Sequence, residues 1–250
     1  SFVLVCLLAS QSAAVSSAAG QAAPPASGVP ALGLPSSTGL VVSTSSHASD
    51  VGAAILQQGG NAVDAAVATG FALAVTHPAA GNIGGGGFML IRLPSGEVTS
   101  IDYREKAPLK ATPGMYLDAA GKIDRSLTAA GYLAPGVPGT VRGLALAHQK
   151  LGRLSWKAVV MPAVRLAEEG FAMPGGLAGG LNAQLEGAMG KFPSSVEAYG
   201  KPGGGKWAAG DRLVLKDLGR SLRAIAENGP DAFYTGWIAD LIERDMKANG

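Results

Sequence analysis

The feature that most constrains this chain is a run of glycines that leads straight into an apolar segment, in GNIGGGGFMLIRLPSGEVTSIDYRE at residues 81–105. Glycine-rich loops bind phosphate when their N–H groups open a helix. Here Gly84–Gly87 is followed by neither Lys-Ser nor Lys-Thr, the run contains no G-x-G-x-x-G motif, and residues 88–93 do not begin a helix. We therefore expect glycine leading into a strand, where the missing Cβ lets another backbone or a ligand approach closely.

The residues after the glycines predict a β-hairpin. Leu93–Glu97 reads LPSGE, a turn sequence, and it separates two runs that alternate roughly as strands do. Residues 87–104 are therefore expected to form two antiparallel strands joined by that turn. Arg104 falls where the second strand ends.

Two helices are predicted before the hairpin. The stretch GLVVSTSSHAS at residues 39–49 predicts a strand, and Ser49 and Asp50 then offer N-cap chemistry for a helix through Gln58.

The second of these helices begins at Asn61, with Asp64 in a capping-box-like arrangement, and stops at His77-Pro78. It is apolar on nearly every face, which predicts burial between layers or at a subunit contact.

The C-terminal half is predicted to be mostly helical. Residues 108–139 are irregular, with a turn in DAAGK, and residues 184–210 predict a glycine- and lysine-rich loop. Helices are expected in PGVPGTVRGLALAHQKLG, in SWKAVVMPAVRLAEEGF, where Pro162 is expected to break or kink the run, and in KDLGRSLRAIAENGPDAFYTGWIADLIERDMKANG. The last helix should place four apolar side chains on one face: Ile238, Leu241, Ile242 and Met246.

Length and charge set the broad class. The 250 residues suffice for one large domain or for a portion of a larger one. Basic and acidic residues number 20 and 18, without a dense basic cluster, so we expect neither nucleic acid nor a membrane surface as a partner.

The N-terminal stretch predicts export to the periplasm or out of the cell. The apolar run SFVLVCLLAS is too short to span a bilayer and is followed by small residues, so residues 1–22 are interpreted as the remnant of a signal peptide. The basic region and initiator Met of such a peptide are missing, which suggests that the chain begins inside its gene. Residues 23–38, rich in Pro, Ala, Gly and Ser, predict a flexible leader, and residues 39–250 are expected to be the folded portion.

Most self-contained catalytic chemistry is absent from the sequence. His47, His77 and His148 are far apart, without the spacing of a zinc helix, and each favours a structural role. Neither G-x-S-x-G nor a supported S-x-x-K motif occurs, and the only cysteine, Cys6, would be lost with the signal peptide. We predict no metal and no cofactor.

One charged cluster, Asp102–Lys106, supports two hypotheses. The first is a solvated strand end whose charges neutralise one another. The second is that Arg104 projects from a rigid strand end and offers its planar guanidinium to a carboxylate, a geometry that lysine cannot copy.

The order of motifs resembles the N-terminal part of the large subunit of the γ-glutamyltranspeptidases, also called glutathione hydrolases. The matching segments cover nearly all of residues 39–250; they are DVGAAILQQGGNAVDAAVA, HPAAGNIGGGGFML, DYREKAP, GVPGTVRGL, LAEEGF and ENGPDAFYTGWIA. A lone glycine run would be weak evidence, but this succession in this order is specific.

The resemblance implies an α+β fold, the four-layer αββα sandwich of the N-terminal nucleophile hydrolases, only partly present in this chain. It implies a precursor that cuts itself, so that a threonine becomes the first residue of a small subunit and attacks the γ-glutamyl amide of glutathione or another γ-glutamyl compound. The acyl group then passes to water or to an amino acid or peptide. In the family the arginine of the R-E-x-A-P motif binds the α-carboxylate of the γ-glutamyl group, and Arg104 matches that position. The glycine run is expected in the buried sandwich.

The self-cleavage site is expected beyond Gly250, because TSSH at residues 44–47 leads into a capped helix rather than starting a strand. We therefore expect the chain alone to have no turnover. Two alternatives stay open: a related acylase acting on a cephalosporin side chain or poly-γ-glutamate, and a non-catalytic periplasmic binding protein.

Overall fold

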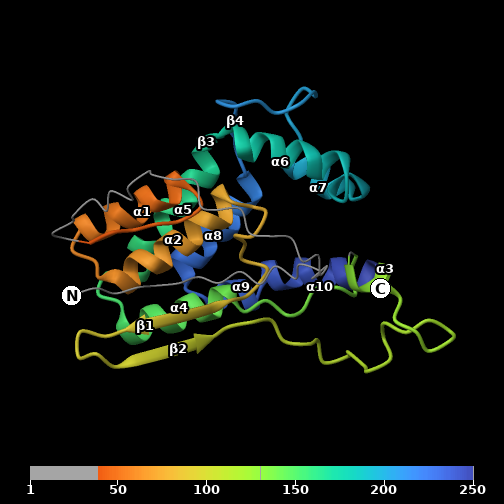
Figure 1. Ribbon diagram of the computed structural model, residues 1–250, viewed down its shortest axis with the longest axis horizontal. Coiled ribbons are helices and arrows are strands. Elements are labelled where there is room, and N and C mark those ends of the chain that lie inside the picture. The colour runs from red at the N-terminus through yellow and green to blue at the C-terminus, as the bar shows by residue number, and fades with distance from the viewer. Residues whose placement is uncertain (1–38, 130, 250) are drawn as a thin grey trace, which may run out of the picture.

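The computed structural model describes residues 39–129 and 131–249 (Figure 1). The predicted signal-peptide remnant and leader, residues 1–22 and 23–38, lie outside the described residues. None of the helices in the described part is both long and apolar enough to cross a bilayer.

Helices dominate the described chain, with two small antiparallel sheets of two strands each, β1–β2 and β3–β4. This mixture agrees with the predicted α+β class. In chain order the elements are α1 (Ser46–Gln57), α2 (Ala62–Thr76), β1 (Phe88–Arg92), β2 (Val98–Asp102), α3 (Arg125–Ala129), α4 (Thr140–Leu151), α5 (Trp156–Glu169), β3 (Phe171–Ala172), α6 (Gly175–Glu186), the 3-10 helix η1 (Met189–Lys191), α7 (Pro193–Tyr199), β4 (Arg212–Leu213), α8 (Lys216–Asn228), α9 (Asp231–Tyr234) and α10 (Trp237–Asn249).

Helix α2 is the centre of the packing. Helices α1, α4 and α5 all contact it, and α8 packs on α5 (Figure 1). Twelve of its 15 residues are buried, as the absence of a polar face predicted. The predicted capping box is also confirmed, because Asn61 Oδ1 accepts from the backbone N–H groups of Val63 and Asp64 while the Asp64 carboxylate accepts from the Asn61 N–H.

The carboxylate of Asp64 is fully buried and joins α2 to the connection between α4 and α5. It accepts hydrogen bonds from the backbone N–H groups of Arg153 and Leu154, at 3.0 and 3.3 Å. His148 Nε2 lies 2.9 Å from the Leu154 carbonyl oxygen and 3.7 Å from Asp64 Oδ1. The backbone donors give the buried carboxylate hydrogen-bond partners and join α2 to the entry into α5.

The predicted start of α1 was wrong. Residues 39–45 form no strand, and the helix begins at Ser46, ahead of the predicted caps Ser49 and Asp50. The cap is Ser45, whose side chain accepts from the Ala48 N–H. Val41 packs beside Gly52 of α1, so its β-branched side chain fills a helix contact instead of a sheet.

The predicted hairpin is confirmed. Strands β1 and β2 pair in antiparallel register from Phe88 opposite Asp102 to Arg92 opposite Val98. Met89 is fully buried while the neighbouring Phe88 and Leu90 are exposed, which is the alternation of a sheet covered on one face. Helix α4 contacts β2 along the covered side (Figure 1).

Several predictions for the C-terminal half differ from the structure. Helix α5 continues through Pro162 without the predicted break, and the short α3 was not predicted in residues 108–139. The predicted loop 184–210 begins with the end of α6, η1 and α7, so the loop that follows α7 covers only residues 200–210 of that range. Trp207 explains this order, since its ring is buried and its indole N–H donates to the Tyr199 carbonyl.

The predicted apolar face of α10 is only partly covered. Ile238 is buried, whereas Leu241 and Ile242 are exposed in the described chain.

Candidate functional site

Three backbone segments meet at the end of β2: residues 81–87, 103–106 and 136–143. The Gly85 carbonyl accepts from the N–H groups of Gly139 and Thr140, at 2.8 and 2.9 Å, and so satisfies donors at the N-terminus of α4. Lys106 and Val137 exchange two backbone hydrogen bonds, of 3.1 and 2.8 Å. The Tyr103 N–H donates to the Gly87 carbonyl at 2.9 Å, so main-chain bonds hold the segment that carries Arg104 on both sides.

Glycine is required at this junction because the backbones touch. A Cβ added at Gly86 would lie 2.6 Å from the Tyr103 carbonyl oxygen and 2.7 Å from the Arg104 Cα. A Cβ at Gly139 would overlap the same carbonyl, and one at Gly143 would overlap the Tyr103 ring. The close backbone approach predicted from the sequence is confirmed.

The glycine run was predicted to be buried, and this prediction was wrong. Residues 81–87 are half-buried or exposed. The run still packs closely on its neighbours, because an added Cβ would meet residue 73 of α2 at Gly81 and residues 103–105 at Gly86.

Tyr103 is the buried centre of the junction. The residue is 6% exposed, and Gly87 and Gly143 lie against its side chain. Burial raises the pKa of its phenol to about 12, because an ionised oxygen would lose its hydration there. The next residue, Arg104, thus follows a buried residue in the chain.

Arg104 itself is exposed, and its side chain is paired with Asp102. Its Nε donates to Asp102 Oδ1 at 3.2 Å and its Nη2 donates to Oδ2 at 2.9 Å. The guanidinium carbon lies 4.7 Å from the centroid of the Phe88 ring. Hydrogen bonds from Arg104 lower the pKa of Asp102, and the same bonds raise the pKa of Arg104. Part of the cluster therefore neutralises itself, as the first hypothesis expected.

A hollow of about 580 Å³ opens beside this segment. It is lined by Glu105, the residue after Arg104, and by residues of the two glycine-rich segments: Asn82, Gly84, Gly85, Ala134, Pro135 and Gly136. Backbone and small side chains form most of its wall, so its shape depends on the junction rather than on flexible side chains.

Helix α9 is bonded to the start of α4, next to this junction. The hydroxyl of Tyr234 accepts from the Arg142 N–H at 3.0 Å and donates to the Pro138 carbonyl at 3.1 Å. It serves as a side-chain cap for α4, whose N-cap residue is Gly139 and offers none. Arg142 also pairs with Asp231 at 2.7 Å, which ties α4 to α9 a second time.

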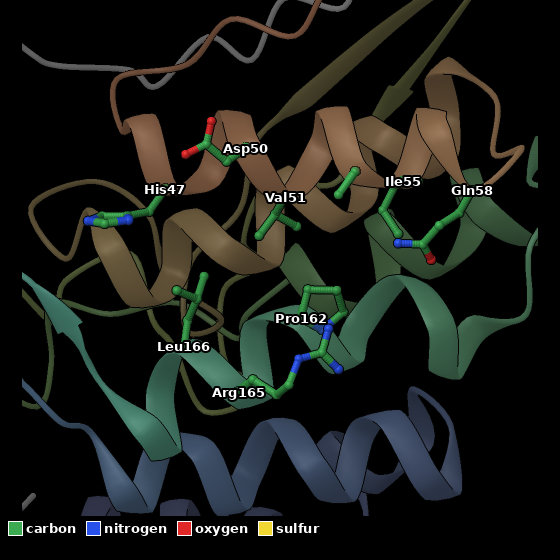
Figure 2. A pocket seen from close by; sticks show the side chains of 9 residues that line it. His47, Asp50, Val51, Ile55, Gln58, Pro162, Arg165 and Leu166 are labelled. Atoms are coloured by element: carbon green, nitrogen blue, oxygen red, sulfur yellow. The ribbon is translucent and has the colours of Figure 1, made fainter.

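A second groove, of about 290 Å³, lies between α1 and α5 (Figure 2). Figure 2 shows Asp50 on the α1 wall with its carboxylate turned away from the groove, and Arg165 on the α5 wall. Between them the groove is mainly apolar, with Val51, Ile55 and Leu166 facing it. It brings no set of reactive groups together.

The histidines stay apart in the structure. His47 Nε2 contacts the Ala172 carbonyl at 3.1 Å, His77 caps the end of α2, and His148 lies in the last turn of α4. Across residues 39–129 and 131–249 no group of three or more His, Cys, Asp and Glu side chains could hold a metal ion.

Sequence reasoning singled out Arg104 but missed the parts that hold it. Gly139, Gly143 and Tyr234 lie far along the chain from the strand they support. One signal was available: a glycine inside the amphipathic helix TVRGLALAHQKL costs helix stability, so its presence indicates close packing there.

Comparisons with known proteins fit this architecture. A family model described as Gamma-glutamyltranspeptidase matches residues 48–250. The Glutathione hydrolase proenzyme of Escherichia coli (strain K12) is 49% identical over 212 residues, which are 85% of this chain and 36% of that protein. The chain spans about a third of the length of the curated relatives it matches.

Solved structures of γ-glutamyltranspeptidases are also similar to this chain. The γ-glutamyltranspeptidase of Helicobacter pylori is 47% identical with a TM-score of 0.83, covering 86% of this chain and 62% of that one. A cephalosporin acylase from Bacillus halodurans is more distant, at 27% identity and a TM-score of 0.71, covering 81% and 38%. These likenesses confirm the predicted α+β, N-terminal nucleophile hydrolase fold class.

Proposed function

The chain belongs to the gamma-glutamyltranspeptidase family, and from this premise we propose that its complete gene product is an enzyme that hydrolyses and transfers γ-glutamyl groups. The substrates are glutathione and other γ-glutamyl compounds, and the acceptors are water, amino acids or peptides. The observation that carries the proposal is the position of Arg104, exposed at a strand end that main-chain bonds fix on both sides.

In this proposal Arg104 binds the α-carboxylate of the γ-glutamyl group. A guanidinium stays charged at any pH of interest and presents a rigid planar fork, which suits a carboxylate. Asp102 occupies the edge formed by Nε and Nη2, so the end of the fork at Nη1 is left toward solvent. The hollow next to Glu105 offers room for the rest of a small substrate.

The bond-breaking group belongs to another part of the gene product. We propose that residues 39–250 form the N-terminal portion of a large subunit and that self-cleavage frees a threonine on a small subunit. The word proenzyme in the names of the relatives supports such processing. We also propose export to the periplasm or the medium, directed by residues 1–22, which lie outside the described residues.

The test is steady-state kinetics of the complete gene product with a chromogenic γ-glutamyl anilide. Arg104→Lys should raise KM about tenfold or more and change kcat less, because it weakens binding of a carboxylate that is present in both ground and transition states. Arg223→Lys is the matched control, since Arg223 is also a partly exposed arginine paired with a carboxylate, Glu168, but lies on α8. An unchanged KM in Arg104→Lys would remove Arg104 from the site.

A second candidate function is an acylase of the same fold, which the likeness to the Bacillus halodurans enzyme supports. Comparing a γ-glutamyl anilide with a glutaryl anilide separates the two, because the second keeps the carboxylate but lacks the α-amino group. A preference for the glutaryl compound would favour the acylase. No turnover of either by the complete gene product would favour a non-catalytic binding protein.

A further inference from the structure

Asp102 and Arg104 are joined by three hydrogen bonds at an exposed strand end. Asp102 Oδ1 accepts from the Arg104 backbone N–H at 3.0 Å and from its Nε at 3.2 Å, while Oδ2 accepts from Nη2 at 2.9 Å. Both carboxylate oxygens are used, and both the backbone and the side chain of Arg104 are engaged.

The contact fixes the direction of the guanidinium. An arginine fork has a side edge, formed by Nε and one terminal nitrogen, and an end edge, formed by the two terminal nitrogens. Asp102 holds the side edge, and the Phe88 ring lies under the guanidinium, 4.7 Å from its carbon. Within the described residues Nη1 has no hydrogen-bond partner, so the end edge is the one presented outward.

We propose that Asp102 is a positioning residue that holds Arg104 with its end edge toward the carboxylate of a γ-glutamyl compound. This inference rests on the proposed function. Asp102 does not touch the ligand; it acts by keeping a long side chain in one orientation before the ligand arrives. Immobilising a side chain in advance lowers the entropy that binding would otherwise lose.

A purely structural role for the pair is the competing explanation, and exposure argues against it. The side chains of Arg104 and Asp102 are 61% and 52% exposed. Ion pairs in that setting contribute little to folding, because water screens them. Removing the pair should therefore leave the thermal stability almost unchanged, so a change in substrate binding could not be explained by unfolding.

The sharpest variant is Asp102→Asn in the complete gene product. The amide keeps one oxygen, which can still accept from the Arg104 N–H, but its nitrogen cannot accept from Nη2. The turn after β2 and the bond from Nε are thus retained, while the bond from Nη2 and the negative charge beside the guanidinium are lost. We expect KM for the γ-glutamyl anilide to rise about three- to tenfold, kcat to change less than about twofold, and the Tm to stay within about 2 °C.

Two further variants isolate the mechanism. Asp102→Glu restores a carboxylate on a longer arm and should recover part of the lost affinity. Asp102→Asn combined with Arg104→Lys should raise KM no more than Arg104→Lys alone, because Asp102 acts only through the guanidinium. Glu168→Gln, which removes the partner of Arg223 at a remote pair, is the control and should leave KM unchanged.

The outcomes separate this inference from the function on which it rests. Absence of γ-glutamyl turnover in the unmodified protein would overturn the proposed function, and the role of Asp102 with it. An active unmodified protein whose Asp102→Asn variant has the same or a lower KM would overturn the inference alone. Additive effects in the double variant would also overturn it, since they would show that Asp102 acts independently of Arg104.

Discussion

Glycines gather in two regions of this molecule, and the space around them differs. Near Tyr103, a Cβ at Gly86, Gly139 or Gly143 would collide with backbone or ring atoms, and none of the three has a positive φ. In the loop between α7 and β4, Gly203–Gly205 and Gly210 have φ between +80° and +87° and nothing within 4 Å of an added Cβ. One region needs glycine for space and the other needs it for backbone conformation.

This difference shows that the glycines have a different role in each region. At the junction the glycines let three backbones touch, so the position of Arg104 is set by main-chain contacts that side-chain motion cannot relax. In the loop the glycines only allow the chain to turn in the left-handed region. Composition alone cannot tell the two cases apart, but substitution can.

The largest effect is expected for Gly143→Ala in α4. Alanine favours a helix interior over glycine by about 1 kcal/mol. Here the new Cβ would overlap Cβ and Cγ of Tyr103, which lie too near the backbone to rotate away. We expect the overlap to outweigh the gain in helix propensity. The free energy of unfolding should fall by more than about 3 kcal/mol, or the protein should fail to accumulate in folded form. Chemical denaturation of the complete gene product measures this.

The matched control for that variant is Gly179→Ala, in the interior of α6. Gly179 is also helical, and nothing lies within 4 Å of an added Cβ. Only the helix propensity changes, so the protein should be stabilised by about 0.5–1 kcal/mol. If both variants moved stability in the same direction, contact with Tyr103 would not be the reason for glycine at 143.

The next effect is expected inside the glycine run, at Gly86 compared with Gly84. An added Cβ at Gly86 meets three backbone atoms of residues 103–105 within 2.9 Å, whereas at Gly84 the nearest atom is 4.0 Å away. Gly86→Ala should cost about 2–3 kcal/mol and raise KM by displacing Arg104, while Gly84→Ala should be nearly neutral. Equal effects would mean that the run is not held against residues 103–105.

Alkaline pH should weaken the junction through Tyr103. Its pKa is raised from 10 to about 12, so the folded state holds the phenolic proton more tightly than the unfolded state. The stabilisation is therefore complete below pH 10 and lost as pH rises to about 12, with a total of about 2–3 kcal/mol. The free energy of unfolding should fall less over this range in Tyr103→Phe, which keeps the ring. Burial also raises the pKa of Tyr199 and Tyr234, so the difference between the two proteins is the quantity to measure.

Local chemistry made several elements predictable from the sequence. The Asn61 capping box, the lack of a polar face on α2 and the LPSGE turn each depend on nearby residues in the sequence, and all three were predicted correctly. The start of α1 was missed because Ser45, Ser46 and Ser49 are all acceptable caps, and packing of α1 against α2 decides among them.

The support of the site could not be predicted in the same way. The contacts of Tyr103 with Gly143 and of Tyr234 with Pro138 join residues 40 to 96 positions apart, and no periodic pattern encodes such a pairing. Asp102 was visible as a charge in the cluster. Its role as the partner of Arg104 depends on the turn after β2, which brings a side chain back to the N–H two residues ahead.

The smallest effect, and the clearest distinction between the regions, is expected in the loop. Gly204 has a φ of +87°, so Gly204→Ala should cost about 1 kcal/mol in a backbone conformation that alanine avoids. Asparagine tolerates positive φ better than alanine, so Gly204→Asn should cost less than Gly204→Ala. At Gly86 the order should reverse, because asparagine is larger and the limit there is space. Denaturation curves of these four variants give the two orders directly, and the same order at both positions would contradict the separation of steric from conformational glycines.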